Sequence, residues 1–220
     1  MSDYRLHDDL SFCLVDGHPV LLDVGDDRYF RLSGRTEQAF LDFLRDGGRA
    51  SEGNRHLASI GLLTDTPEAA SEVMSTQTAS QSVLELPSQP ERRSFGLLAE
   101  VSATVYGAHY RLKLRKLKNV LRQAAACRAR LPRGEQTDRA QVTKASLAFL
   151  SARALVPVER CCLPDSLAML TYLTRRRLPV NIVFGVVADP FAAHCWVQTA
   201  DLVLNDTLGN TRAHTVIGVF

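Results

Sequence analysis

Residues 156–166 read VPVERCCLPDS, and this stretch predicts the start of a helix that carries a cysteine at its first position. Pro164 suits the first turn of such a helix, because its missing N–H would find no partner there. Leucines then recur every three residues, as on the buried side of a helix. The arginines at 175–177 suit the negative end of the helix dipole, and Pro179 ends the segment. Cys162 therefore lies at a predicted helix N-terminus.

A cysteine in this position ionises easily. The unpaired N–H groups and the positive end of the helix dipole favour the thiolate, and they lower the thiol pKa below its ordinary value of about 8.5. Because the thiolate is the nucleophilic form, Cys162 is a candidate catalytic residue. The alternative is that Cys162 is a small buried hydrophobic residue, as free cysteines usually are.

The elements around this helix predict an α+β domain over residues 92–220. Apolar periodicity indicates one bent helix or two helices over 94–131, and a further helix over Arg139–Ala154. Three apolar strands follow the Cys162 helix, at Val180–Val187, Ala192–Thr199 and Leu202–Asp206. Helices followed by an antiparallel sheet are typical of an α+β design.

A histidine and an aspartate on the last two strands complete a candidate site. If the hairpin loop is Thr199–Asp201, closing on the pair 198:202, then His194 faces Asp206 on the neighbouring strand. Asp206 would accept the ring N–H and leave the other ring nitrogen for a thiol. A two-residue loop would instead pair residue 195 with Asp206 and place the carboxylate on the wrong face. Without that pairing, a lone strand histidine is more often a structural residue.

The N-terminal part predicts a separate winged-helix-like domain at residues 1–65. Three strands are expected at Leu10–Val15, Val20–Val24 and Arg28–Leu32, with the first hairpin turning at Asp16-Gly17. Phe30 and Leu32 would share one face of the third strand, and Tyr29 and Arg31 the other. A helix with an apolar stripe follows Ser33 and ends at Gly47-Gly48, and a shorter one covers about Glu52–Ile60.

Between the two domains the composition shifts to Ser, Thr, Gln, Glu and Pro. Such a segment buries little apolar surface, so we interpret residues 66–91 as a linker. A local helix is expected only at Pro67–Met74.

The small net charge of +2 conceals a strong asymmetry. Residues 1–90 hold 15 acidic and 7 basic residues, whereas the rest of the chain has a net charge of +10. A winged helix often binds DNA, but an acidic unit would repel phosphates, so no nucleic-acid partner is expected. The stretch 111–133 contains nine basic and no acidic residues and is a possible site for a polyanion, although such runs are usually solvated helix faces.

The remaining composition limits the class of protein. No apolar run reaches the roughly 20 residues that span a bilayer, the first residues do not resemble a secretory signal, and the five cysteines lack disulfide-framework spacing. A reduced, cytoplasmic environment is therefore expected. No metal site is predicted, because the Cys161-Cys162 pair lacks the C-x₂-C spacing. No G-x-x-x-x-G-K loop for a nucleotide appears either.

A cysteine at a helix start followed by histidine and aspartate on adjacent strands is the chain order of papain-like and transglutaminase-like folds. Over residues 155–210 the chain closely resembles the leader peptidase of lasso-peptide biosynthesis, the B protein of those pathways. The resemblance rests on CLPDSLA at 162–168, VFGV at 183–186, DPFAAHCWV at 189–197 and VLND at 203–206. Over residues 92–150 only the helical character and its placement fit. The N-terminal unit resembles the winged-helix precursor-recognition element of the same pathways.

The resemblance implies a cysteine peptidase that removes the leader of a ribosomally made precursor, with Cys162 as nucleophile, His194 as acid and base, and Asp206 as its partner. The Cys-Leu-x-x-Ser-Leu pattern selects Cys162 rather than Cys161. Cleavage near a threonine one residue before the cut is implied, as is a partner cyclase that resembles asparagine synthetase and uses ATP. In such a recognition element the leader adds as a strand along the third strand. Its expected contacts here are Arg28, Tyr29, Phe30, Arg31, Leu32, Leu57 and Ile60.

Three other functions remain open at this point. The same three residues could transfer an acyl group to an amine, as in transglutaminases, because both reactions pass through a thioester. The chain could instead be a non-catalytic protein that presents a precursor to another enzyme. A transcription regulator is the third alternative.

Overall fold

The computed structural model describes residues 4–46, 48–49, 51–65, 76–87, 94–129 and 138–220. The chain divides into two compact units, Met1–Met74 and Ser75–Phe220. Within the described ranges, no helix has the length and apolar character required to cross a membrane.

A three-stranded antiparallel sheet forms one half of unit 1. It consists of β2 (Leu10–Val15), β3 (His18–Asp23) and β4 (Arg28–Arg31), in that order. The β2–β3 loop is Asp16-Gly17, and its two residues adopt φ of 53° and 82°. These positive values are those of the tight hairpin turn that the sequence predicts, so that prediction is confirmed. Among the described strands β4 pairs with β3, and it stands at one end of the strand order of this sheet.

Two helices pack on this sheet, α1 (Gly34–Asp46) and α2 (Glu52–Ser59). Phe40 at the centre of α1 has no exposed surface and stacks edge-on against Phe12 of β2, with 5.3 Å between ring centroids. A two-stranded ladder of β1 (Tyr4–Leu6) and β5 (Leu63–Asp65), which the sequence analysis does not predict, completes the unit. The structure thus shows strands and helices in the predicted order, and the winged-helix assignment stays a prediction.

The core of unit 1 corrects one predicted contact residue. Leu57 of α2 is fully buried in the cluster that includes Leu21 and Phe40, so its side chain offers no surface to a ligand. The prediction that Leu57 contacts a leader is therefore wrong: its period along the helix places it in the core. Phe30 and Leu32 also pack against this cluster, on the shared face that the alternation predicts.

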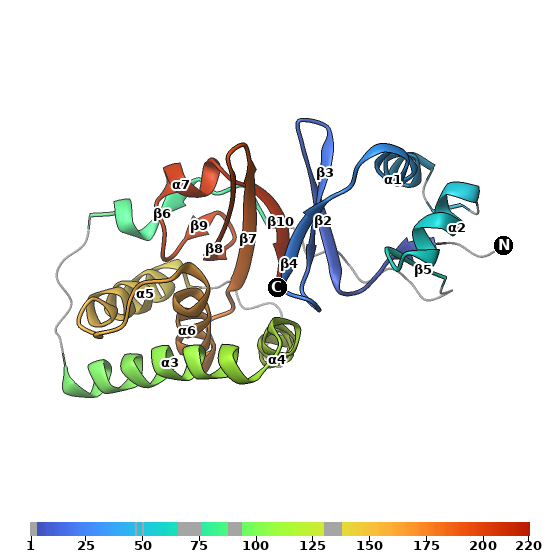
Figure 1. The fold of residues 1–220 in the computed structure, drawn as a ribbon. Coiled ribbons are helices and arrows are strands. Elements are labelled where there is room, and N and C mark those ends of the chain that lie inside the picture. Colours follow the sequence, from blue (N-terminus) through green and yellow to red (C-terminus); the bar gives the residue numbers. More distant parts are fainter. Residues whose placement is uncertain (1–3, 47, 50, 66–75, 88–93, 130–137) are drawn as a thin grey trace. The chain divides into compact units, whose positions relative to one another are not determined.

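Unit 2 combines four main helices with a five-stranded sheet (Figure 1). The helices are α3 (Phe95–Leu114), α4 (Leu117–Ala129), α5 (Arg139–Arg153) and α6 (Cys162–Arg175). The sheet order is β10-β7-β8-β9-β6, in which β7 (Asn181–Ala188) and β8 (Phe191–Thr199) form the long central hairpin and β9 (Leu202–Val203) follows. α6 packs against β7 and β8, and α3 and α5 pack against α6. This arrangement confirms the α+β character of the C-terminal part.

Part of the predicted linker belongs to unit 2. β6 (Gln81–Ser82) pairs parallel to β9, and the short helix η1 (Val83–Glu85) follows it. Val83 has no exposed surface and Ser82 is 1% exposed, so both contribute to the interior. The predicted linker at 66–91 is therefore too long, and the predicted domain start at residue 92 is too late. The local helix predicted at Pro67–Met74 lies outside the described residues.

Two further elements follow β9 that the sequence analysis does not predict. α7 (Leu208–Arg212) begins at Thr207, whose hydroxyl accepts the Asn210 N–H, and β10 (Thr215–Val219) pairs antiparallel with β7. β10 thereby covers the side of β7 that does not face β8.

Candidate active site

Cys162 is the first residue of α6, as predicted. Cys161 precedes it as the N-cap residue in an extended conformation, and its side chain makes no capping hydrogen bond. The helix is 14 residues long, so its dipole and its unpaired N–H groups act directly on the half-buried Cys162 thiol. The packing of α6 on β8 brings this helix start to the strand that carries His194.

His194 lies between Cys162 and Asp206. Its Nε2 bonds to Asp206 Oδ2, and the Cys162 thiol, which lines the same cavity, contributes to the raised pKa of the ring. Because Nε2 is engaged by the carboxylate, Nδ1 is the nitrogen left for the thiol. The structure thus brings together the three residues that the sequence singled out.

The strand register behind this contact differs from the predicted one. Gln198 pairs with Val203 and Thr199 with Leu202, so the hairpin loop has two residues, Ala200 and Asp201. Ala200 adopts φ of 46°, a value that alanine rarely takes, and this tight loop replaces the predicted three-residue loop. The predicted pairing of residue 194 with 206 is therefore wrong, although the two side chains do meet.

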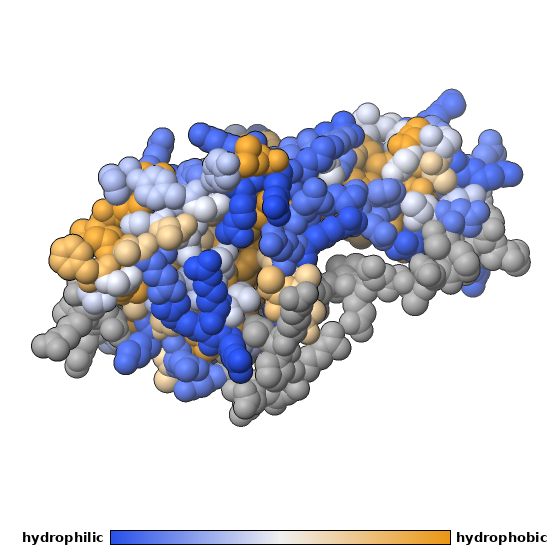
Figure 2. All heavy atoms as spheres, turned by 90° about the horizontal axis from the view of Figure 1, so that it is seen from below, coloured by the Kyte–Doolittle hydropathy of each residue, from blue (hydrophilic) through white to orange (hydrophobic). Residues whose placement is uncertain are grey.

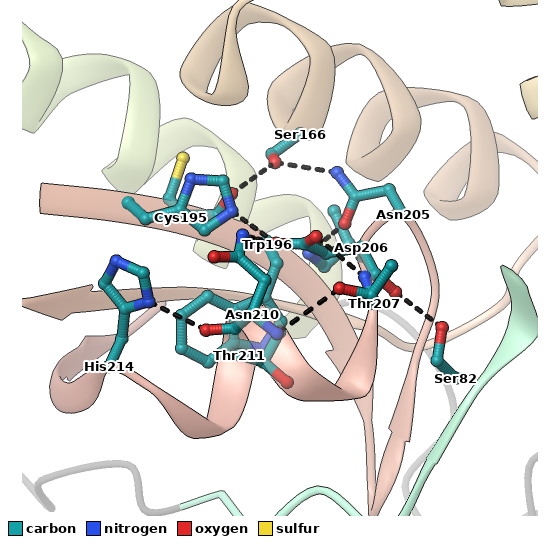
Figure 3. A network of polar contacts seen from close by, with 12 residues as sticks. Ser82, Ser166, Cys195, Trp196, Asn205, Asp206, Thr207, Asn210, Thr211 and His214 are labelled. Atoms are coloured by element: carbon teal, nitrogen blue, oxygen red, sulfur yellow. Dashed lines mark hydrogen bonds and ion pairs between the residues drawn. The ribbon is translucent and has the colours of Figure 1, made fainter. Parts of the chain in front are cut away.

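Asn205 explains how the carboxylate still reaches the histidine. The Leu204 N–H bonds to Val197 O, but the Val197 N–H donates to the side-chain Oδ1 of Asn205 at 2.7 Å instead of continuing the ladder. The chain thus leaves the regular strand after Leu204. Asn205 Nδ2 also donates to Ser166 Oγ at 2.9 Å, which ties this irregular segment to α6 (Figure 3).

Three neighbours hold Asp206 in addition to His194. Its Oδ1 accepts the Thr207 N–H at 2.7 Å, its Oδ2 accepts Asn210 Nδ2 at 2.8 Å, and its backbone oxygen accepts Ser82 Oγ at 2.5 Å (Figure 3). Burial opposes ionisation, but the hydrogen bonds from His194, Thr207 and Asn210 outweigh it and lower the pKa of Asp206.

The electrostatics of the site favour a thiolate beside an imidazolium. Hydrogen bonds from the Cys195 side chain and from His194 lower the pKa of Cys162 to about 4, against the opposing effect of burial. Hydrogen bonds to Asp206 and Cys162 raise the pKa of His194 to about 9. Between these two values both residues are charged and attract each other. The buried Cys195 keeps its proton, because its hydrogen bond to Cys162 and its burial raise its pKa.

Aromatic side chains support the His194 ring. Trp196 stacks beside it at 6.1 Å between centroids, and the His214 ring lies 5.4 Å away. Gly185 is the strand partner of His194. A Cβ at Gly185 would lie 2.8 Å from the Cβ of His214 and 2.9 Å from the Trp196 ring, so only glycine leaves room for both.

A cavity of about 210 Å³ opens over these residues. Phe149 and Leu150 of α5 form an apolar part of its wall, and the Arg153–Asp165 pair forms a charged part. The rest of its lining consists of Arg160, Cys161, Cys162, His194, Cys195, Asn205 and Asp206. Cys162, His194 and Asp206 therefore share one cavity.

Sequence reasoning missed several residues of this site. Ser82 and Asn205 act through contacts with residues far away in the sequence. Asn210 lies only four residues after the Asp206 that it holds, but no local pattern marks it. Asn205 directly precedes Asp206 at the end of a predicted strand, which is the only signal that could have drawn attention to it. Arg153 stands at the end of a predicted helix. A basic residue is common there because it complements the helix dipole, so its presence indicated no further role.

The basic stretch at 111–133 lies apart from the cavity. Its described residues occupy the end of α3 and α4, and none of them lines the cavity. Burial and the nearby Arg175 and Arg115 lower the pKa of Arg111, so positive charges gather here. Figure 2 shows the side on which α3 lies in Figure 1, with hydrophilic residues over much of it.

The other predicted contact residues lie in unit 1. Arg28 and Arg31 on β4 are exposed, Tyr29 is half-buried, and Ile60, which follows α2, is 50% exposed. In the described residues, no group of three or more His, Cys, Asp or Glu side chains is placed to hold a metal ion.

A thiolate that is hydrogen-bonded to an imidazolium, whose other nitrogen is held by a carboxylate, can attack a carbonyl and form a thioester. Comparison with known families agrees with this class of site. A family described as the transglutaminase-like superfamily matches residues 105–219, which is 115 of the 220 residues. The chain therefore belongs to the transglutaminase-like superfamily, whose fold fits a cysteine peptidase or an acyltransferase. No curated protein and no solved structure matches the chain.

Proposed function

We propose that this protein is a cytoplasmic leader peptidase of lasso-peptide maturation. The observation that carries the proposal is the contact of Cys162 with His194 and of His194 with Asp206 at the mouth of a cavity. The resemblance of residues 155–210 to the B proteins of lasso pathways supplies the substrate class.

The proposed reaction begins with attack of the Cys162 thiolate on the scissile carbonyl. The carbonyl oxygen becomes an oxyanion that the Cys162 backbone N–H at the helix start stabilises. His194 then gives its proton to the leaving amine as the carbon–nitrogen bond breaks, and a thioester remains on Cys162. Neutral His194 next removes a proton from water, the resulting hydroxide attacks the thioester, and the acid and the thiolate are released. Asp206 holds the imidazole ring through Nε2 in every step.

Unit 1 is the proposed site of leader recognition. β4 stands at one end of the strand order in its sheet, the position at which an extended leader would add as a further strand. The proposed contacts are Arg28, Tyr29, Phe30, Arg31, Leu32 and Ile60; Leu57 is excluded by its burial. The half-buried Phe30 and Leu32 contribute through their backbone, because their side chains pack against the core.

The proposed partners follow from the same resemblance. They are the leader segment of the precursor and a cyclase that resembles asparagine synthetase. Any requirement for ATP would enter through that cyclase, since the sequence contains no phosphate-binding loop of the G-x-x-x-x-G-K type.

The decisive experiment incubates the purified protein with a synthetic precursor that carries its leader, and follows the product masses. We expect release of the leader by the natural chain. Cys162→Ala should abolish cleavage while the leader still binds, as measured by fluorescence anisotropy. A variant that lacks the Cys162 sulfur and still cleaves the precursor would refute the proposal. If Cys162→Ala leaves maturation of the precursor unchanged, the result favours a non-catalytic protein that only presents the precursor to another enzyme.

Acyl transfer to an amine is the second candidate, and membership of the transglutaminase-like superfamily favours it specifically. Both reactions share the thioester, so they differ only in the group that attacks it. Adding a primary amine to the same incubation separates them. Hydrolysis adds the mass of water to the released acyl fragment, whereas transfer adds the mass of the amine.

A further inference from the structure

Arg153 is a buried cation beside the proposed nucleophile. It is the last residue of α5 and only 4% exposed, although an arginine is rarely buried without partners. The reaction proposed above assigns it no role. Arg153 is also one of the residues that line the cavity over Cys162.

The Arg153 guanidinium connects both sides of the α6 start. Its Nε donates to Asp165 Oδ1 at 2.7 Å, and Asp165 lies in the first turn of α6, three residues after Cys162. Its Nη1 donates to Val156 O at 3.3 Å, and its Nη2 donates to Val158 O and Glu159 O, both at 3.1 Å. Four bonds from one planar group thus hold the segment before Cys162 and the helix turn after it. A lysine ammonium cannot reproduce this fork.

These bonds also orient the peptide units next to the site. In a peptide unit the C=O and N–H groups point in opposite directions. Since the carbonyls of Val158 and Glu159 point at the guanidinium, the N–H groups of Glu159 and Arg160 point away from it. Within the described residues, none of the N–H groups of residues 159–162 donates to a protein acceptor. They form a row of free donors that leads to Cys162, and Arg160, Cys161 and Cys162 line the cavity.

We infer that Arg153 is a positioning residue for the proposed reaction: it fixes residues 156–161 and the first turn of α6, and so places the Cys162 sulfur against His194 and the free N–H groups toward a peptide substrate. Asp165 completes this arrangement by holding Arg153 from the helix side. The inference rests on the proposed function for the substrate, but not for the placement of the sulfur.

The test uses Arg153→Met and Arg153→Lys, with Arg175→Met as the matched control. Arg175 is an exposed arginine at the opposite end of α6 from Cys162, and it is not among the residues that line the cavity. The first readout is the pH dependence of Cys162 alkylation by iodoacetamide, followed by mass spectrometry of the Cys162 peptide. The second readout is kcat and KM for cleavage of a leader-bearing peptide. Thermal unfolding by circular dichroism shows whether each variant is folded.

Both Arg153 variants should move the midpoint of the alkylation profile up by at least about one pH unit, because the sulfur loses its hydrogen bonds when the helix start shifts. kcat should fall at least about tenfold in both. Arg175→Met should leave the alkylation midpoint and kcat unchanged. Should Arg153→Met fail to fold, Arg153→Lys and Asp165→Asn decide the question by the same two readouts.

A folded Arg153 variant with the midpoint and kcat of the natural chain would overturn the inference, even if it melted at a lower temperature, because Arg153 would then be merely structural. If the natural chain alkylates at low pH but cleaves no leader peptide, the proposed function fails. The shifted midpoint would still support the positioning role, so the two failures can be told apart.

Discussion

Replacing Asp206 by asparagine changes one charge at the centre of the site and keeps the size of the side chain. Asp206 is the largest cause of the raised pKa of His194, which is about 9 in the natural chain. Without that carboxylate we expect the pKa to fall toward the ordinary histidine value of about 6.5. The imidazolium is present below the pKa and is lost as the pH rises through it, so the variant should lose it at a much lower pH.

The size of the effect follows from these two values. At pH 8 a histidine of pKa about 9 is roughly 90% protonated, whereas one of pKa about 6.5 is about 3% protonated. Cleavage at pH 8 should therefore fall up to about thirtyfold, because the imidazolium donates the proton to the leaving amine. At pH 6 the same loss of imidazolium is less than about twofold. The basic limb of the kcat/KM profile should move from about 9 toward about 6.5.

Two measurements check this expectation. NMR titration of the His194 ring gives its pKa without any substrate, and kcat/KM for a leader-bearing peptide between pH 5 and about 10 gives the activity. Asp201→Asn serves as the control, since this carboxylate lies in the β8–β9 loop and bonds to Ser80 and Arg139 instead of His194. The reasoning is refuted if His194 in Asp206→Asn still titrates near 9.

Three further outcomes test the remaining parts of the site. Cys161→Ser should retain most cleavage activity in the mass assay, because the Cys161 side chain makes no capping bond, and complete loss would transfer the nucleophile's role to Cys161. Gly185→Ala should lower the free energy of unfolding in urea by about 1–3 kcal/mol, since its Cβ would overlap the Trp196 ring and the Cβ of His214. Gly209→Ala, with nothing within 4 Å, should be nearly neutral, and equal effects of the two variants would contradict the packing argument. Alanine at both Tyr29 and Arg31 should weaken leader binding about tenfold in fluorescence anisotropy, or ~1.4 kcal/mol, without changing alkylation of Cys162; undiminished binding would exclude β4 as the recognition edge.

The parts of the site that depend on local chemistry could be predicted from the sequence. Pro164, the spacing of the leucines and the terminal arginines mark α6, and the structure begins that helix at Cys162. The hairpin turn at Asp16-Gly17 could also be predicted from the local sequence, because both residue types tolerate positive φ. These signals act within a few residues, so no knowledge of the tertiary structure is needed to interpret them.

The strand register could not be predicted, because two local departures from regular geometry determine it. Ala200 takes a positive φ that its residue type does not announce, and Asn205 replaces a backbone acceptor with its side chain. A prediction that assumes regular strand pairing includes neither the positive φ of Ala200 nor the side-chain acceptor of Asn205. The contact of His194 with Asp206 was expected for a register that the chain does not adopt.

Elements that form only through pairing with distant strands were also missed. β6 has two residues and β9 has two, so neither shows a period that a sequence can reveal. The polar composition of residues 66–91 favours a linker, yet Val83 is buried because the pairing of β6 places it in the interior of unit 2. Similarly, the position of Leu57 in α2 did not distinguish a core residue from a contact residue.

The parallel strand β6 has a consequence for how this chain could be separated into two polypeptides. Ser82 reaches the backbone of Asp206, and β6 closes one edge of the sheet in unit 2. If the chain were divided between Asp65 and Thr76, the C-terminal fragment would keep its fifth strand and the hydrogen bond from Ser82 to Asp206. A division at residue 91 would remove both from the C-terminal fragment. A gene fission at that point would therefore produce a fragment whose sheet lacks an edge strand and whose Asp206 lacks the hydrogen bond from Ser82.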